Sequence, residues 1–357
     1  MEKPESVGES WSLTKHIYLY IPLCKFSAKS VGRVACRWVY KDIYRYITST
    51  MLLIVVVVAS VSPMATLYFS VQQVYAQTTG VICDGYIIER GNFDADPDDE
   101  VRINGTVYNN GSTITLNTSL GIKTYTILIA TSSYTLGTPG NDLIIGTNED
   151  DDIYGKEGDD FIVGFGGNDY LYGDYIDGTP GNDTIRGGDD ILCGNDGDDR
   201  LYGDSIYGYA GNDTITGGND ILYGGAGNDL LYGDVLSGGA GNDTITGGND
   251  VLYGGDNDDW LTGDSIYGGG DDDSLTGGAD ILYGGAGNDL LYGDGMGQDD
   301  YGNDYIVGGN DTLYGGPGND RLYGDGIGEF GSNYGNDTIV GGADTLYGGA
   351  GNDLLYG

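Results

Sequence analysis

The stretch GGAGNDLLYGD at residues 284–294 decides the fold, because the same eleven residues also stand at 224–234. Its first ten residues form the last ten of the chain, 348–357. Between residues 164 and 283, glycine-initiated blocks of nine, five, nine and seven residues add up to a 30-residue super-repeat that occurs four times without insertion. The next two units, 284–314 and 315–347, are slightly longer. Self-similarity at a fixed period predicts a solenoid.

The blocks share a short apolar tail, Asp-x-Ile/Leu-x, before the next glycine. Alternation along a strand sends the middle residue of this tail to one face and its neighbours to the other. The pattern therefore predicts a buried ladder of aliphatic side chains, which begins with Ile144, Ile153, Ile162, Leu171, Ile176, Ile185, Leu192, Leu201 and Ile206. The outward neighbours are often tyrosine, for which stacking between adjacent strands is the favoured explanation and a glycan-binding face the alternative.

The turns between the tails have six residues (GGAGND), four (GGND) or two (GD). Glycine adopts left-handed backbone conformations at no steric cost and lets its carbonyl approach a ligand closely. Backbone carbonyls together with carboxylates are the oxygen ligands that Ca²⁺ prefers, and it needs six to eight of them. A single turn does not supply that many, so the pattern predicts Ca²⁺ sites between stacked turns.

These nine-residue blocks resemble the repeats-in-toxin (RTX) nonapeptide, G-G-x-G-x-D-x-U-x with U a large aliphatic residue, which is a calcium-binding β-helix repeat. The resemblance covers residues 137–357, and sixteen six-residue turns carry it. It implies an all-β parallel β-roll, a β-solenoid that holds several Ca²⁺ ions. It also implies metal ligands at the aspartate that ends each turn: Asp142, Asp151, Asp160, Asp169, Asp183, Asp199, Asp213, Asp229, Asp243, Asp259, Asp273, Asp289, Asp304, Asp320, Asp337 and Asp353.

After residue 172 the chain departs from the family pattern, because six-residue turns alternate with short ones. If two strands make one coil, the long turns fall on one edge, with at most 13 Ca²⁺ sites between 14 turns. Such a roll has about 14 coils and a length of roughly 70 Å. On the opposite edge we expect the short turns to bind Ca²⁺ weakly or not at all, their aspartates capping backbone N–H groups instead.

The charge of −40 is unevenly distributed. Residues 1–50 contain eight Lys and Arg against four acidic residues, whereas the rest contains seven against 51. So acidic a body repels nucleic acid and anionic lipid head groups, which excludes nucleic acid as a partner. It also repels itself unless cations bind.

The N-terminal part, residues 1–76, is typical of a targeting segment. A basic stretch precedes the apolar run at 51–69, and Val74-Tyr75-Ala76 fits a signal cleavage site after Ala76. The alternative is an uncleaved membrane anchor at 51–69. Both place the body outside the cytoplasm, at the cell surface or secreted. Residues 77–136 alternate apolar and polar positions and predict a small β-rich cap on the first coil.

The four cysteines form no close pair and predict no zinc site, but Cys83 and Cys193 could form a disulfide outside the cell. The only histidine, His16, lies in the targeting segment, which excludes histidine-based triads from the exported part. We therefore expect no enzyme. The pattern favours a structural or adhesive surface protein with a glycan or protein partner; the alternative is the accessory roll of a secreted hydrolase or toxin-like protein whose catalytic part lies elsewhere.

Overall fold

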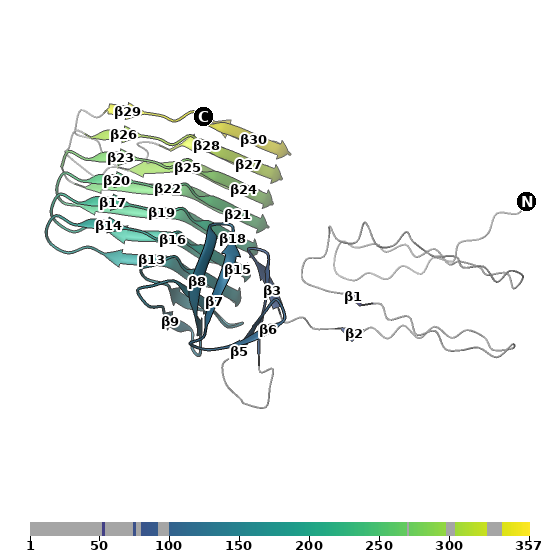
Figure 1. The fold of residues 1–357 in the computed structure, drawn as a ribbon. Helices are drawn as coiled ribbons and strands as arrows, with labels where there is room; N and C mark the ends of the chain where they lie inside the picture. Colours follow the sequence, from purple (N-terminus) through teal and green to yellow (C-terminus); the bar gives the residue numbers. More distant parts are fainter. Residues whose placement is uncertain are drawn as a thin grey trace, which may run out of the picture. The chain divides into compact units, whose positions relative to one another are not determined.

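The computed structural model describes residues 52–53, 74–75, 80–91, 100–269, 271–297, 304–326 and 338–357. The chain divides into two compact units, Met1–Thr48, which lies outside these residues, and Ser49–Gly357. The described residues form strands and turns (Figure 1). Most of the predicted signal or anchor segment lies outside them, apart from the antiparallel pair β1 (Leu52–Leu53) and β2 (Val74–Tyr75). None of the described segments is a helix of the length and apolarity needed to cross a bilayer.

A four-stranded antiparallel sheet precedes the roll. Its strands are β3 (Gly80–Cys83), β4 (Tyr86–Arg90), β5 (Glu100–Ile103) and β6 (Thr106–Asn109). The hairpin of β7 (Thr113–Thr118) and β8 (Gly121–Ile129) follows, and β8 pairs in parallel with the first strand of the roll. Ile88 and Val101 of the small sheet are fully buried and belong to the same hydrophobic cluster as Phe161 of the roll. The small sheet thus shares a core with the first coils.

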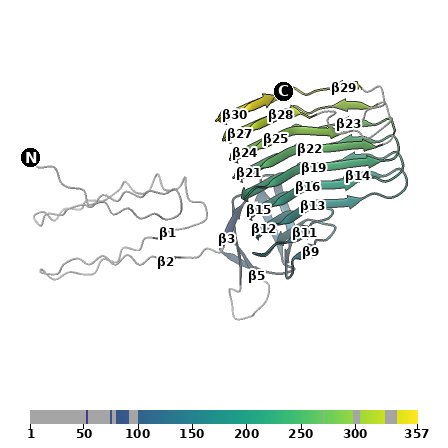
Figure 2. The same cartoon turned by 180° about the vertical axis from the view of Figure 1, so that it is seen from behind.

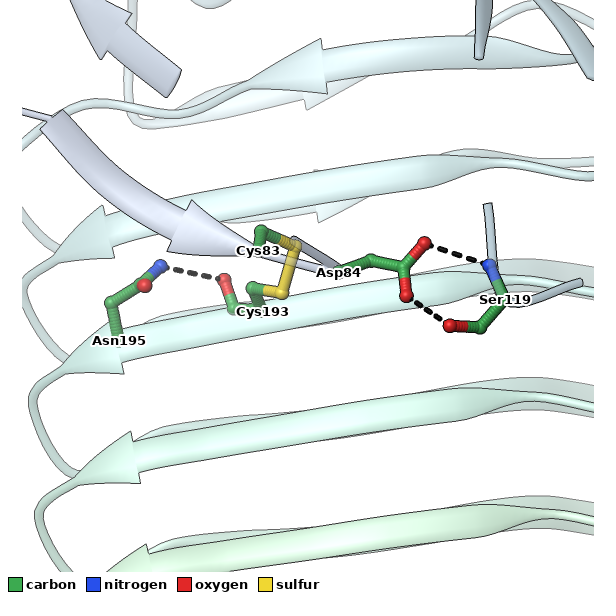
Figure 3. The surroundings of a disulfide bond; sticks show 5 residues. All are labelled: Cys83, Asp84, Ser119, Cys193 and Asn195. Carbon is green, nitrogen blue, oxygen red and sulfur yellow. Dashed lines mark hydrogen bonds between the residues drawn. A yellow bond between two sulfur atoms is a disulfide. The ribbon is translucent and has the colours of Figure 1, made fainter. Parts of the chain in front are cut away.

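A disulfide between Cys83 and Cys193 joins β3 to the roll (Figure 3). Beside it, Asp84 accepts hydrogen bonds from the backbone N–H and the hydroxyl of Ser119. Asn195 donates its side-chain amide to the Cys193 carbonyl at 3.2 Å. The pairing that the sequence left open is therefore formed between the small sheet and the roll.

The roll consists of three parallel sheets (Figures 1 and 2). The first sheet continues from β7 and β8 through β10 (Asp142–Ile145), β12 (Phe161–Gly166), β15 (Ile191–Asp196), β18 (Ile221–Ala226), β21 (Val251–Asp256), β24 (Ile281–Ala286), β27 (Thr312–Pro317) and β30 (Thr345–Ala350). The second sheet contains β9 (Tyr134–Leu136), β11 (Asp152–Tyr154), β13 (Tyr170–Asp177), β16 (Arg200–Tyr207), β19 (Leu230–Gly239), β22 (Trp260–Gly269), β25 (Leu290–Gly297), β28 (Arg321–Asp325) and β31 (Leu354–Tyr356). The third sheet contains β14 (Thr184–Arg186), β17 (Thr214–Thr216), β20 (Thr244–Thr246), β23 (Ser274–Thr276), β26 (Tyr305–Val307) and β29 (Thr338–Val340).

The register shows how large one coil is. In the first coils Ile144 pairs with Ile162, two nine-residue blocks further along the chain. Ile162 then pairs with Leu192, a full super-repeat away. From there each coil contributes one strand to each of the three sheets. The expectation that two strands make one coil is therefore wrong beyond the first coils. The estimate of about 14 coils is also wrong, because the third sheet has six strands, one for each wide coil.

The physical reason for the wide coil lies in the two-residue GD segment. Leu201 and Ile206 are both buried in the single strand β16, with Gly203-Asp204 between them. Two residues at this position do not reverse the chain, so two predicted strands merge into one long strand. The chain then turns only at the GGND and six-residue segments.

The predicted aliphatic ladder is confirmed except at Ile176 and Ile185, which are only partly buried, and it forms two separate clusters. One cluster lies between the first and second sheets and includes Leu192, Leu201 and Leu222. The other lies between the second and third sheets and includes Ile206 and Ile215. The outward tyrosines stack from strand to strand, as in the pair Tyr172–Tyr202 with ring centroids 4.7 Å apart and planes 5° apart. Stacking between strands, the favoured explanation of these tyrosines, is thus confirmed.

Candidate metal centre

The aspartates that end the six-residue turns lie in three rows rather than along one edge. The row that precedes the second-sheet strands contains Asp151, Asp169, Asp199, Asp229, Asp259, Asp289, Asp320 and Asp353. The row that precedes the third-sheet strands contains Asp183, Asp213, Asp243, Asp273 and Asp304, while Asp337 lies outside the described residues. Asp142 and Asp160 begin a row that precedes the first-sheet strands and continues with short-turn aspartates. The expectation of a single edge with 13 sites is therefore wrong, because the wide coil has two corners with long turns.

Within a row, one carboxylate oxygen of each aspartate fixes the turn. The backbone N–H of Asp199 donates to Oδ1 of Asp229 at 2.9 Å, and the N–H of Asp229 donates to Oδ1 of Asp259 at 2.9 Å. The same contact recurs in the third-sheet row, where Asp213 donates to Asp243 at 2.7 Å. Each carboxylate is thereby held in one orientation by the coil before it.

In most of these carboxylates the second oxygen is buried without a hydrogen-bond donor, whereas Oδ2 of Asp183 accepts from Thr179 and Oδ2 of Asp213 accepts the N–H of Tyr209. The buried oxygens without a donor include Oδ2 of Asp160, Asp169, Asp199, Asp229, Asp243, Asp259, Asp289 and Asp320, and Oδ1 of Asp142 and Asp151. Such an oxygen destabilises the fold unless a donor or a cation meets it. Desolvation accordingly raises the pKa of Asp229 to about 7 and that of Asp259 to about 8. Residues 137–357 contain 44 acidic and only four basic residues, so the side chains of the roll cannot supply the missing positive charge.

The space beside the second oxygen is bounded by backbone carbonyls. A Cβ added to Gly224 would lie 2.7 Å from the Gly254 carbonyl oxygen and would overlap Oδ2 of Asp229. The next coil repeats this arrangement, since a Cβ on Gly254 would lie 2.5 Å from the Gly284 carbonyl oxygen and overlap Oδ2 of Asp259. In these two turns the first glycine therefore keeps open a space that is lined by a carboxylate and a carbonyl. These are hard oxygen donors, and they fit Ca²⁺.

At Gly227 a later position of the turn stacks closely on the preceding coil. Gly227 has φ +148°, and a Cβ there would overlap the carbonyl of Gly197 in the coil before it. At the corresponding place in the following turn, Asn257 has φ 82°. Asparagine tolerates the left-handed region better than most residues, so it can occupy this place.

The short turns contain functional candidates that the sequence pattern did not predict. As expected, their aspartates cap backbone groups: Oδ2 of Asp204 accepts the N–H of Gly218 at 2.5 Å. The same residues, however, also converge on one another. Five groups of three carboxylates each have ligand atoms within 4.8 Å of one another: Asp174, Asp190 and Asp204; Asp204, Asp220 and Asp234; Asp234, Asp250 and Asp264; Asp264, Asp280 and Asp294; Asp294, Asp311 and Asp325.

Burial is the main cause of the electrostatic strain in these groups. It raises the pKa of Asp204 and of Asp220 well above the usual value, and neighbouring carboxylates raise both further. The signal that could have revealed the groups is the super-repeat itself, because a coil of that length places the GD and GGND segments opposite each other.

Comparison with known proteins identifies the family to which this chain belongs. A search of curated proteins finds no match. The family model of the RTX calcium-binding nonapeptide repeat matches residues 145–174, 172–201, 194–219, 216–234, 232–261, 263–280, 276–295, 299–326 and 332–357, which together cover more than half of the chain. Stacked turns with uncompensated carboxylates are what such repeats require to bind Ca²⁺. The chain therefore belongs to the RTX calcium-binding repeat family, and multiple Ca²⁺ ions are its cofactor.

Proposed function

We propose that this protein is an exported β-roll that folds when Ca²⁺ binds and then has a structural or adhesive role at the cell surface. The observation that carries the proposal is the set of buried carboxylate oxygens without a donor, repeated from coil to coil. Because the ion binds the folded chain and not the unfolded one, its binding free energy contributes to folding. We assign the sixteen turn aspartates from Asp142 to Asp353 as ligands of these ions.

Calcium also supplies a reason for export before folding. Extracellular modules bind Ca²⁺ with Kd values of about 10⁻⁴–10⁻³ M, which is far above cytoplasmic calcium. The chain then remains unfolded inside the cell and folds outside it. The targeting pattern of residues 1–76 and the disulfide between Cys83 and Cys193 support the same compartment, since disulfides persist in oxidising surroundings. We expect the mature chain to begin at Gln77.

The role at the surface is either that of a rigid spacer or that of a binding module. The outward tyrosines support binding, since Tyr253 and Tyr347 leave 36% and 51% of their surface exposed. Stacking between strands accounts for the same side chains without any partner. Retention of the full chain on cell-wall glycan in calcium, and its release by chelator, would support the binding module; no retention in either condition would leave the spacer.

Protection from chymotrypsin tests the proposal, because the roll is rich in tyrosine. The full chain should be cleaved throughout residues 137–357 in chelator and should resist cleavage in millimolar Ca²⁺ but not in equal Mg²⁺. Equal resistance in chelator and in calcium would refute calcium-dependent folding. Export is tested separately by the N-terminal sequence of the secreted chain, where an intact Met1 would contradict cleavage after Ala76.

A further inference from the structure

The short-turn aspartates form a continuous line inside the roll. Asp174, Asp204, Asp234, Asp264, Asp294 and Asp325 come from the second-sheet strands, and Asp190, Asp220, Asp250, Asp280 and Asp311 precede the first-sheet strands. Ten of these eleven side chains are at most 1% exposed, and Asp325 is partly buried. We call them the carboxylate column.

The carboxylate column divides the interior of each wide coil. Asp204 lies in β16 between Leu201, which belongs to one hydrophobic cluster, and Ile206, which belongs to the other. Asp220 likewise stands between Ile215 of the second cluster and Leu222 of the first. Charged groups thus occupy the centre of the coil, where an apolar residue would be expected to join the two clusters.

Each carboxylate of the column has one fixed oxygen and one without a donor. Oδ2 of Asp234 accepts the N–H of Gly248 at 2.6 Å, while its Oδ1 has no hydrogen-bond partner. Oδ1 of Asp220 accepts the N–H of Asp190 at 2.8 Å, while its Oδ2 has none. These carboxyl groups, each with one buried oxygen that lacks a donor, are the ones that form the groups of three with ligand atoms within 4.8 Å of one another. Only a proton or a cation can bring such groups together in a buried site.

Glycines on both sides leave the room that these carboxylates need. A Cβ on Gly203 would overlap the carboxylate of Asp220, and a Cβ on Gly217 would overlap that of Asp234. Neither glycine has a positive φ, so the backbone conformation alone does not require glycine at either place. The recurring glycines of the GD and GGND segments are therefore explained by space around the column.

We propose that the carboxylate column holds a second series of Ca²⁺ ions, one for each group of three carboxylates, inside the roll and separate from the ions of the six-residue turns. Asp204, Asp234, Asp264 and Asp294 each belong to two neighbouring groups and bridge successive ions. Five divalent ions carry ten positive charges against eleven carboxylates, so the described column becomes nearly neutral. The choice of ion rests on the calcium-dependent folding proposed above.

Bridging makes a quantitative prediction for Ca²⁺ stoichiometry in the full chain. Asp234→Asn changes a ligand of two groups and should lower the number of bound Ca²⁺ ions by two, whereas Asp220→Asn changes a ligand of one group and should lower it by one. Asp258→Asn is the matched control, because Asp258 is exposed and the equivalent residues Asn228 and Asn288 show that the turn accepts asparagine. Equilibrium dialysis against calcium, with metal analysis, measures the count.

Luminescence of bound Tb³⁺ tests the same sites without any variant. Lifetimes in H₂O and D₂O report the number of waters on each ion, and the buried column predicts a population with no coordinated water in the wild-type chain. Absence of that dry population would overturn the proposal, and so would an unchanged Ca²⁺ count in both folded variants. If either of these results is found while the wild-type chain still folds with calcium, the column proposal is wrong and the proposal of calcium-dependent folding stands. If calcium neither binds nor folds the wild-type chain, both proposals fail.

Discussion

Asp229→Asn should change the stability of the roll in opposite directions with and without calcium. Asp229 is 3% exposed, its Oδ1 accepts the Asp199 N–H, and its Oδ2 has no donor. Asparagine keeps the shape and one acceptor oxygen but loses the charge that attracts the ion. In calcium the variant should therefore be less stable, and in chelator more stable.

The two magnitudes follow from different sources. When the free Ca²⁺ concentration is 100 times the Kd of a site, losing the ion from that site lowers the free energy of unfolding by about 2.7 kcal/mol. In chelator, burial raises the pKa of Asp229 from 3.8 to about 7. At pH 8 this difference in pKa means that the ionised carboxylate destabilises the metal-free fold by roughly 4 kcal/mol. That value is an upper bound on the stability that Asp229→Asn regains in chelator, because solvent and neighbouring charges reduce the penalty.

Denaturant and osmolyte titrations followed by far-UV circular dichroism measure both effects. In calcium, the urea midpoint of Asp229→Asn should fall below that of the wild type. In chelator, where the chain is unfolded, the variant should need less trimethylamine oxide to gain β-structure. Asp258→Asn removes the same charge from an exposed position and should change either midpoint little. A variant that is destabilised equally in both conditions would refute the reasoning, since it would show Asp229 to be a structural hydrogen-bond acceptor only.

Three further predictions concern pH, the aliphatic ladder and the disulfide. Burial raises the pKa of Asp169 from 3.8 to about 7, so the metal-free folded chain binds more protons than the unfolded chain between these two pH values. The stability of the metal-free fold should therefore rise as the pH falls. Circular dichroism in chelator should show more β-structure at pH 4.5 than at pH 8. Leu231→Ala removes a fully buried side chain and should cost about 2–5 kcal/mol in urea unfolding with calcium present, whereas Leu230→Ala, at a partly exposed position, should cost less. The disulfide between Cys83 and Cys193 joins residues 110 positions apart, so Cys83→Ser should lower the free energy of unfolding by up to about 5 kcal/mol. An unchanged free energy of unfolding would show that the small sheet packs on the roll without the disulfide.

Much of the fold follows from the period. The recurring Asp-x-Leu-x tail predicts which residues point inward, and Leu192, Leu201 and Leu222 are indeed fully buried. The same alternation places the tyrosines outside, where like residues stack because the register brings Tyr223 beside Tyr253. Identical repeats align identical side chains, so a local pattern determines a long-range contact.

The size of the coil could not be predicted from the blocks alone. Each block ends in a strand-like tail, and nothing in the tail of residues 200–202 shows that the strand continues through Gly203-Asp204 to Tyr207. The length of the super-repeat was the better guide, because a coil must return to the same register after one full period. Counting strands instead of periods led to the two-strand coil.

The carboxylate column was missed for the same reason. Asp204 and Asp220 are separated by a complete six-residue turn and its strand, and both belong to short turns that lack the glycine pattern of the family. Only a coil as long as the whole super-repeat makes them neighbours across the interior. The disulfide between Cys83 and Cys193 could be named from the sequence only as a possibility, since its formation depends on how the small sheet packs against β15.

A calcium titration of the full chain by far-UV circular dichroism, with magnesium as the control, tests the central claim most directly. The account predicts a cooperative change from coil to β-structure with Ca²⁺ and no such change with equal Mg²⁺. A full β-spectrum in chelator, unaltered by added calcium, would contradict it, because the aliphatic ladder would then suffice to fold the roll without the ion.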